Sequence, residues 1–166
     1  TAAHNRQLEV AQSLCVARAN PNAETDRGFT PLFLAARKGF LDVASTLCGA
    51  GADAGRAARD GRTPLYAASG GGHLELVQLL CGEGADKDKA TDGGWTPLAI
   101  AARNGHLEVV RFLANVGADT CVLVAGGWTL SYIADMYGNP SVLCLLAGAE
   151  PGGEHAEKES REAPEG

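Results

Sequence analysis

The sequence lacks the short motifs that carry nucleophilic, phosphate-binding or metal chemistry in many enzymes. It contains no Gly-x-Ser-x-Gly, no Gly-rich loop ending in Gly-Lys-Ser or Gly-Lys-Thr, no His-Glu-x-x-His and no Cys-x-x-Cys. The glycine-rich run 49–55 follows an expected helix rather than a strand, and it lacks the spacing of a phosphate loop. We therefore predict that this chain has no catalytic activity of its own and binds no cofactor or metal.

Positive charge and long apolar runs are also scarce. The chain has 14 Lys and Arg against 20 Asp and Glu, a formal net charge of −6. Nucleic-acid binding needs clustered Lys and Arg, and the strongest local cluster is only Arg37-Lys38. No apolar run approaches the roughly 20 residues of a membrane-spanning helix. The sequence therefore predicts neither nucleic-acid binding nor membrane insertion.

What the chain does contain is a 33-residue repeat. Thr30, Thr63, Thr96 and Thr129 stand one period apart, and the first three begin Thr-Pro-Leu. In the same register a glycine follows each threonine by nine residues, and three units close on Gly-Ala-Asp. A fixed period of this length indicates a solenoid, in which each unit buries its apolar face against its neighbours.

The unit around Thr63 shows how each repeat should fold. The Thr63 hydroxyl is expected to cap a helix that begins at Pro64, by accepting a hydrogen bond from a backbone amide of the first turn. Proline suits the first helical position because its fixed φ is already helical and it has no amide hydrogen that would be left unpaired there. The glycine run 70–72 should end this helix, since left-handed backbone is easily adopted by glycine. A second helix with an apolar stripe opens at His73 and leads into an extended turn. Each unit is predicted to be helix, turn, helix and projecting hairpin.

These motifs resemble the ankyrin-repeat family, whose units read Gly-x-Thr-Pro-Leu-x-x-Ala-Ala-x-x-Gly-His-Leu-Glu-Val-Val and close on Gly-Ala-Asp. The resemblance covers nearly everything before Glu150. It implies an all-α fold, an ankyrin-repeat solenoid of stacked helix-turn-helix units with projecting β-hairpin loops. The register predicts a partial repeat at 1–25, repeats at 26–58, 59–91 and 92–124, a divergent terminal repeat at 125–150, and a disordered acidic tail at 151–166.

Both ends depart from the repeat. Thr1 falls inside a first helix whose Thr-Pro-Leu start is absent, and no initiator methionine is present, so we expect a fragment of a longer protein. In the terminal repeat Leu130 replaces the proline and Asp135 the second alanine, as in a divergent capping unit. Residues 151–166 have no large apolar side chain to offset their ordering entropy. We interpret them as a linker or tail, with an acidic interaction motif as the alternative.

The cysteines recur in register on the expected second helices. Cys15, Cys48 and Cys81 are one period apart, and neighbouring helices pack about 8–10 Å apart, farther than the roughly 7 Å limit for disulfide-bonded Cα atoms. We expect buried free thiols in a reducing compartment, cytoplasmic or alternatively nuclear. Cys121 and Cys144 are expected to be more exposed.

Histidines and aspartates also recur. We interpret His73 and His106, beside the inter-helix glycine, as hydrogen-bonding residues that order the turn rather than as a metal pair. Asp53, Asp86 and Asp119 are each expected to bond local backbone amides.

The resemblance also implies where partners dock, on a concave face formed by hairpin tips and first helices. The variable positions there are the residue before each threonine and the pair before each inter-helix glycine. The candidate partner-binding residues are Phe29, Arg37, Lys38, Arg62, Trp95, Arg103, Asn104, Trp128, Met136 and Tyr137. We expect Trp95 and Trp128 to project towards the same side as binding hot spots, or alternatively to cover their hairpins.

One departure from the family concerns the contact between repeats. The histidine that follows Thr-Pro-Leu in the family is replaced by Phe33, Tyr66, Ala99 and, in the same register, Tyr132. The usual inter-repeat hydrogen-bond chain is therefore expected to be missing, with packing of these rings in its place.

Two classes of function follow from the sequence. The first is a protein-protein interaction module, monomeric or part of a larger chain, whose protein partner the sequence does not identify. The alternative is a regulatory or targeting segment of a larger enzyme, channel or ubiquitin-ligase subunit, with its chemistry outside these residues.

Overall fold

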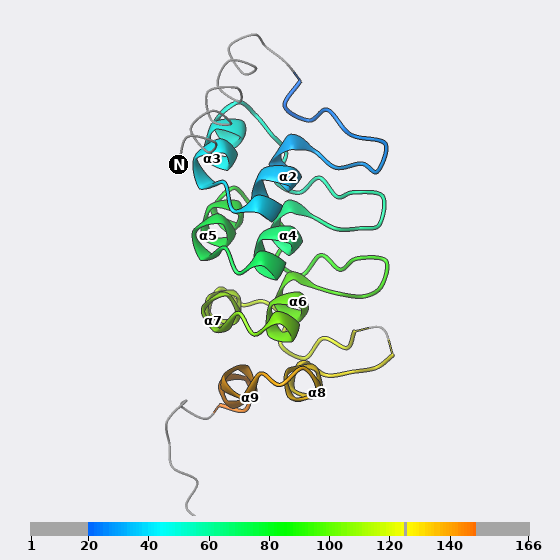
Figure 1. The fold of residues 1–166 in the computed structure, drawn as a ribbon, viewed down its shortest axis with the longest axis vertical. Coiled ribbons are helices and arrows are strands. Elements are labelled where there is room, and N and C mark those ends of the chain that lie inside the picture. The colour runs from blue at the N-terminus through cyan, green and yellow to red at the C-terminus, as the bar shows by residue number, and fades with distance from the viewer. Residues whose placement is uncertain (1–19, 125, 149–166) are drawn as a thin grey trace, which may run out of the picture.

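The helices stack in two columns with loops projecting along one side (Figure 1). The structure is a computed structural model that describes residues 20–124 and 126–148. The start of the partial repeat and the acidic tail, with the predictions made for them, lie outside these residues. The helices are α2 Pro31–Lys38, α3 Leu41–Gly49, α4 Pro64–Gly71, α5 Leu74–Gly82, α6 Pro97–Asn104, α7 Leu107–Asn115, α8 Leu130–Met136 and α9 Pro140–Leu146.

The first helix of each pair begins where the threonines predict. Thr63 has extended backbone, and its hydroxyl accepts a hydrogen bond from the amide of Tyr66 at 3.1 Å. The threonines before α2, α6 and α8 make the same bond three residues on. At the other end of α4, Gly72 adopts φ 72°, which a side chain would strain. The predicted start and stop are therefore confirmed.

The core runs between the two columns. Leu32, Leu65 and Leu98, which follow the prolines, are fully buried, and helices of one column pack on the same column in neighbouring repeats. In the last repeat Ser131 stands in this register, and Leu130, in the proline position, is buried instead. The all-α solenoid is confirmed, whereas the exact limits of the repeats stay a prediction.

The projecting loops are not extended hairpins. Two backbone hydrogen bonds close each loop, such as Ala58 N to Arg62 O at 2.8 Å and Gly61 N to Ala58 O at 3.0 Å. Within the described residues the single β-bridge joins Val124 to Trp128. Neighbouring loops touch instead, because the amide of Asp92 donates to Asp60 O at 3.2 Å. The predicted projecting loops are therefore present, but almost no strand forms in them within the described residues, and they also donate hydrogen bonds to neighbouring loops.

The aspartates behave as predicted and also link repeats. Each of Asp53, Asp86 and Asp119 accepts a hydrogen bond from the amide two residues on, at 2.9, 2.9 and 2.8 Å. Asn22 and Asp88, which occupy equivalent positions of their repeats, accept hydrogen bonds from the amides of Asp53 and Asp119 in the next repeat, both at 2.8 Å. These bonds hold each loop against its neighbour.

Hydrogen bonds join the repeats at the inter-helix turns rather than at the position after Thr-Pro-Leu. His106 Nε2 lies 3.0 Å from the carbonyl oxygen of Gly70, in the preceding repeat. Asn139, in the same register, donates to the carbonyls of Ala102 and Arg103 at 3.0 and 2.7 Å. His106, which lies at the inter-helix turn of its own repeat, therefore also forms a hydrogen bond to the preceding repeat. Bonds of this kind join the repeats, so ring packing does not have to replace them.

The thiols are free but only partly buried. Cys48 and Cys81 are half-buried, and burial raises the pKa of both, with Glu83 adding to the effect at Cys48. Cys121 is exposed as predicted, whereas Cys144 is half-buried like the other two. Full burial of the thiol ladder was a wrong prediction, because Cys48 and Cys81 lie in the last turns of α3 and α5, where part of each side chain stays exposed. Cys15 lies outside the described residues.

Candidate functional site

The candidate residues lie on what we call the first-helix face, the surface of α2, α4, α6 and α8 with the loops before them. The structure leaves them unequally accessible. Phe29 is buried, with 8% of its surface exposed. Arg62, Trp95 and Arg103 are half-buried. The exposed candidates are Arg37, Lys38, Asn104, Trp128, Met136 and Tyr137.

Phe29 belongs to a stack on the first-helix face. Its ring lies parallel to that of Phe33, with centroids 4.5 Å apart and planes 7° apart. The guanidinium of Arg62, from the next repeat, lies 5.3 Å from the Phe29 centroid, and that of Arg37 lies 5.9 Å from it. Cations above ring faces are attracted by the ring quadrupole. Phe29 therefore supports the arginines, and the expectation that it contacts a partner directly does not fit its burial.

Asp60 positions Arg62 in this stack. The Asp60 Oδ2 atom accepts from Arg62 Nε at 2.7 Å and from Arg62 Nη2 at 2.6 Å. The hydrogen bond from Arg62 holds the pKa of the Asp60 carboxyl below its ordinary value, and it raises the pKa of Arg62. The guanidinium is therefore charged and held in place at the surface.

A second group of rings surrounds Arg103. Its guanidinium lies 5.3 Å from the Trp95 ring centroid and 4.8 Å from that of Tyr137 in the last repeat. Trp128 is 37% exposed and tilts against Tyr132, at 5.9 Å between centroids. The two tryptophans are thus not equivalent, because Trp95 is partly covered and Trp128 is open. The recorded ring pairs also lie within single repeats rather than between them.

Of the remaining exposed candidates, Lys38, Asn104 and Met136, the last two differ in their contacts. Asn104 Nδ2 donates to the carbonyl oxygen of Gly70 at 2.8 Å, so it helps to join repeats. Met136 is 47% exposed at the end of α8, in register with Arg37 and Arg103. Equivalent positions of a repeat face the same side. Met136 therefore extends the first-helix face into the last repeat.

A hollow of about 330 Å³ opens in the middle of the first-helix face. We call it the glycine hollow, because Gly70 and Gly71 stand where the other repeats carry long side chains. The sequence contains this signal, since two glycines stand at variable positions, but the sequence by itself does not show that a hollow forms there. The hollow is lined by Phe33, Arg37, Arg62, Tyr66, Ala67, Gly70, Gly71 and Ile100.

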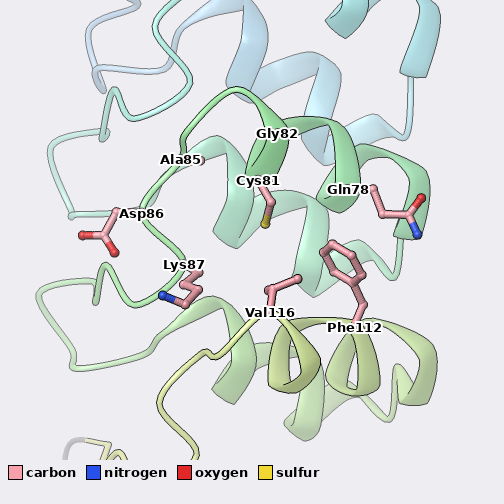
Figure 2. Close-up of a pocket in the computed structure, with 8 residues that line it drawn as sticks. All are labelled: Gln78, Cys81, Gly82, Ala85, Asp86, Lys87, Phe112 and Val116. Carbon is pink, nitrogen blue, oxygen red and sulfur yellow. The ribbon is translucent and has the colours of Figure 1, made fainter.

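A second hollow, of about 660 Å³, lies on the other column between α5 and α7 (Figure 2). We call it the second-helix groove. Phe112 on α7 and Val116, the residue that follows α7, point towards Cys81 on α5, while Asp86 and Lys87 lie at one end (Figure 2). Val116 is 42% exposed, and it stands in the register of Glu83. Sequence reasoning missed this groove, although an apolar residue in a polar register marks it.

The described residues offer interaction surfaces rather than a metal centre. Across 20–124 and 126–148, no three His, Cys, Asp or Glu side chains gather in a way that could hold a metal ion. No helix in that part of the chain is long and apolar enough to span a bilayer. What the arrangement provides is aromatic rings, guanidinium groups and shallow hollows, which suit contact with another macromolecule.

Stacked helix pairs with projecting loops place the chain in the class of helical repeat solenoids. A family model described as ankyrin repeats, in 3 copies, matches residues 1–91 and residues 83–155. The chain therefore belongs to the ankyrin-repeat family, as its Thr-Pro-Leu and Gly-Ala-Asp motifs predicted. No curated protein matches it. Ankyrin repeats are generally protein-protein interaction modules and are typically not catalytic.

Proposed function

We propose that this chain is a protein-protein interaction module whose partner docks on the first-helix face. The main support for this proposal is that the exposed large apolar side chains gather in one part of the chain. Of those in the described residues, most belong to α8 and the segment flanking it, namely Leu123, Trp128, Tyr132, Met136 and Tyr137. Tryptophan, tyrosine and methionine are enriched in protein interfaces, and clustered exposure of this kind marks contact sites.

The arginines of the same face support the proposal. No ion pair joins Arg37 or Arg103 to a carboxylate within residues 20–124 and 126–148. Both guanidinium groups instead stack on rings, which holds their charge at the surface in fixed positions. Arginine is favoured at interface hot spots because it combines planar apolar area with several donors.

Affinity capture from lysate of the source cells tests the proposal. The Trp128→Ala/Met136→Ala variant should lose a captured protein that wild type retains, because a hot-spot truncation costs about 2 kcal/mol or more in binding. Val116→Ala is the matched control, since Val116 is as exposed as Met136 but lies at the second-helix groove. Equal recovery of every prey by both variants, at unchanged melting temperature, would contradict docking on the first-helix face.

We propose a module that is monomeric by itself or part of a larger chain, binds no nucleic acid, and resides in the cytoplasm or nucleus. The acidic net charge and the free thiols of Cys48 and Cys81 support this. Sequencing the full reading frame tests the alternative, because a flanking catalytic or membrane domain would make the array its regulatory or targeting segment.

A further inference from the structure

The glycine hollow is the place where this array departs most from its own repeat. Positions 70 and 71 are in register with Arg37-Lys38 and with Arg103-Asn104, so two long side chains are replaced by hydrogen atoms. The helix is kept, since α4 still runs to Gly71 before Gly72 turns it. The consequence is an opening of about 330 Å³ between side chains that the neighbouring repeats supply.

The bottom of the hollow is apolar. Ile100, from α6, is buried, and a Cβ added to Gly70 would come within 3.2 Å of its Cγ1 atom. Phe33 is also buried, and Ala67 lies beside it on α4. No ionisable side chain is among these three. A partner's aliphatic carbon atoms can therefore be removed from water here.

The rim of the hollow is positively charged. Arg37 is exposed at one edge, and Arg62 is held at the same edge by Asp60 and by the ring of Phe29. Tyr66 forms part of the wall, where burial raises its pKa. This site carries two guanidinium groups on a chain whose net charge is −6. The local charge is thus opposite to that of the molecule as a whole.

We infer that the glycine hollow binds an aspartate or glutamate side chain of the partner, with an adjacent apolar residue of the same peptide segment against Ile100. This inference rests on the proposed function, because it names the chemistry of the partner at that face. A guanidinium group binds a carboxylate through charge-assisted hydrogen bonds, which are roughly twice as strong as hydrogen bonds between neutral groups. Asp60 competes for Arg62, so Arg37 supplies the principal contact.

A phage-displayed library of random linear peptides, selected against wild type, provides the probe. Enriched peptides are expected to carry Asp or Glu next to Leu, Ile, Val or Phe. A synthetic copy of an enriched peptide should bind at least about tenfold more weakly to Arg37→Gln and more weakly at high salt. Selection of no peptides, or of peptides without acidic residues, would overturn the inference.

Filling the hollow tests its geometry separately from its charge. Gly70→Met copies the residue that Met136 provides in the last repeat, and it should reduce peptide binding at least about tenfold by occupying the space. Gly82→Ala is the matched control, because it also removes a helical glycine but meets no atom within 4 Å. Asp60→Asn should strengthen binding severalfold, since it releases Arg62.

These outcomes separate the inference from the proposed function. Peptide binding unchanged by both Gly70→Met and Arg37→Gln would overturn the inference, even if Trp128→Ala/Met136→Ala loses its captured partner. Loss of binding in Arg37→Gln, with the fold retained by circular dichroism, supports it if Gly70→Met proves too unstable to use. Should lysate capture contradict docking on the first-helix face, the peptide results still decide whether the hollow recognises a carboxylate.

Discussion

The first-helix face and the second-helix groove are built by the same repeat but have different chemistry. On the first-helix face, Arg37 and Arg103 lie over aromatic rings. On the second helices, Arg111 instead faces Glu108 of its own helix, at 3.8 Å. An arginine paired with a neighbouring carboxylate in this way offers less charge to a partner. The shared framework therefore builds both surfaces, whereas the residues at the variable positions decide where a hollow opens and what it attracts.

Removing a shared core side chain should have the largest effect, because it breaks both surfaces. Leu80→Ala truncates a fully buried residue of α5 and should lower the free energy of unfolding by about 3 kcal/mol. Urea denaturation followed by circular dichroism measures this. Leu41→Ala, at an exposed leucine of α3, is the control and should cost well under about 1 kcal/mol. Equal losses in the two variants would contradict the placement of the core.

Separating neighbouring loops should have the next largest effect. Gly61 has φ 78°, and a Cβ there would lie 2.9 Å from the Asp92 backbone nitrogen. Gly61→Ala should therefore cost about 2–3 kcal/mol, from backbone strain plus displacement of the next loop. Gly51→Ala, at φ 86° with no atom within 4 Å, should cost only the strain, about 1 kcal/mol. Equal costs in thermal unfolding would mean that the loops do not touch.

Removing a buried hydroxyl beneath the first-helix face should have a smaller effect, and it should stabilise the fold rather than destabilise it. Ser69 is fully buried, its Oγ atom finds no hydrogen-bond partner in the described residues, and Ala36 and Ala102 occupy its register. Ser69→Ala should raise the free energy of unfolding by about 1 kcal/mol, because an unsatisfied polar group is removed. Ser45→Ala, on the exposed side of α3, should change it little. A destabilised Ser69→Ala would reveal a partner for the hydroxyl.

Partial burial of the Cys81 thiol in the second-helix groove should be visible as slow alkylation rather than as a change in stability. Burial raises the pKa of Cys81, although Lys87 acts in the opposite direction. A raised pKa lowers the thiolate fraction at a given pH below that pKa, and the thiolate is the species that is alkylated. Cys81 should therefore react with iodoacetamide more slowly than exposed Cys121 at pH 8, with its rate still rising at higher pH. Peptide mass spectrometry over time measures both, and equal rates would contradict the partial burial.

The sequence was sufficient where a structural role depends on a few neighbouring residues. Thr63 caps its helix and Asp86 binds the amide two residues on because both bonds are local. It was not sufficient for Phe29, which is covered by Arg62 from the next repeat, 33 residues away. The glycine hollow likewise needs Ile100 from a third repeat. Contacts of this kind depend on the stacking geometry, which the period alone does not specify.

Position-specific photocrosslinking tests the central claim, that a partner docks on the first-helix face, most directly. A photoreactive phenylalanine analogue is placed at Met136 in one protein and at Val116 in another, two positions exposed at 47% and 42%. Because their exposure is matched, differences in capture from lysate report the docked face rather than accessibility. We expect a specific crosslinked partner from position 136 and none from position 116. A partner crosslinked from 116 alone would contradict it.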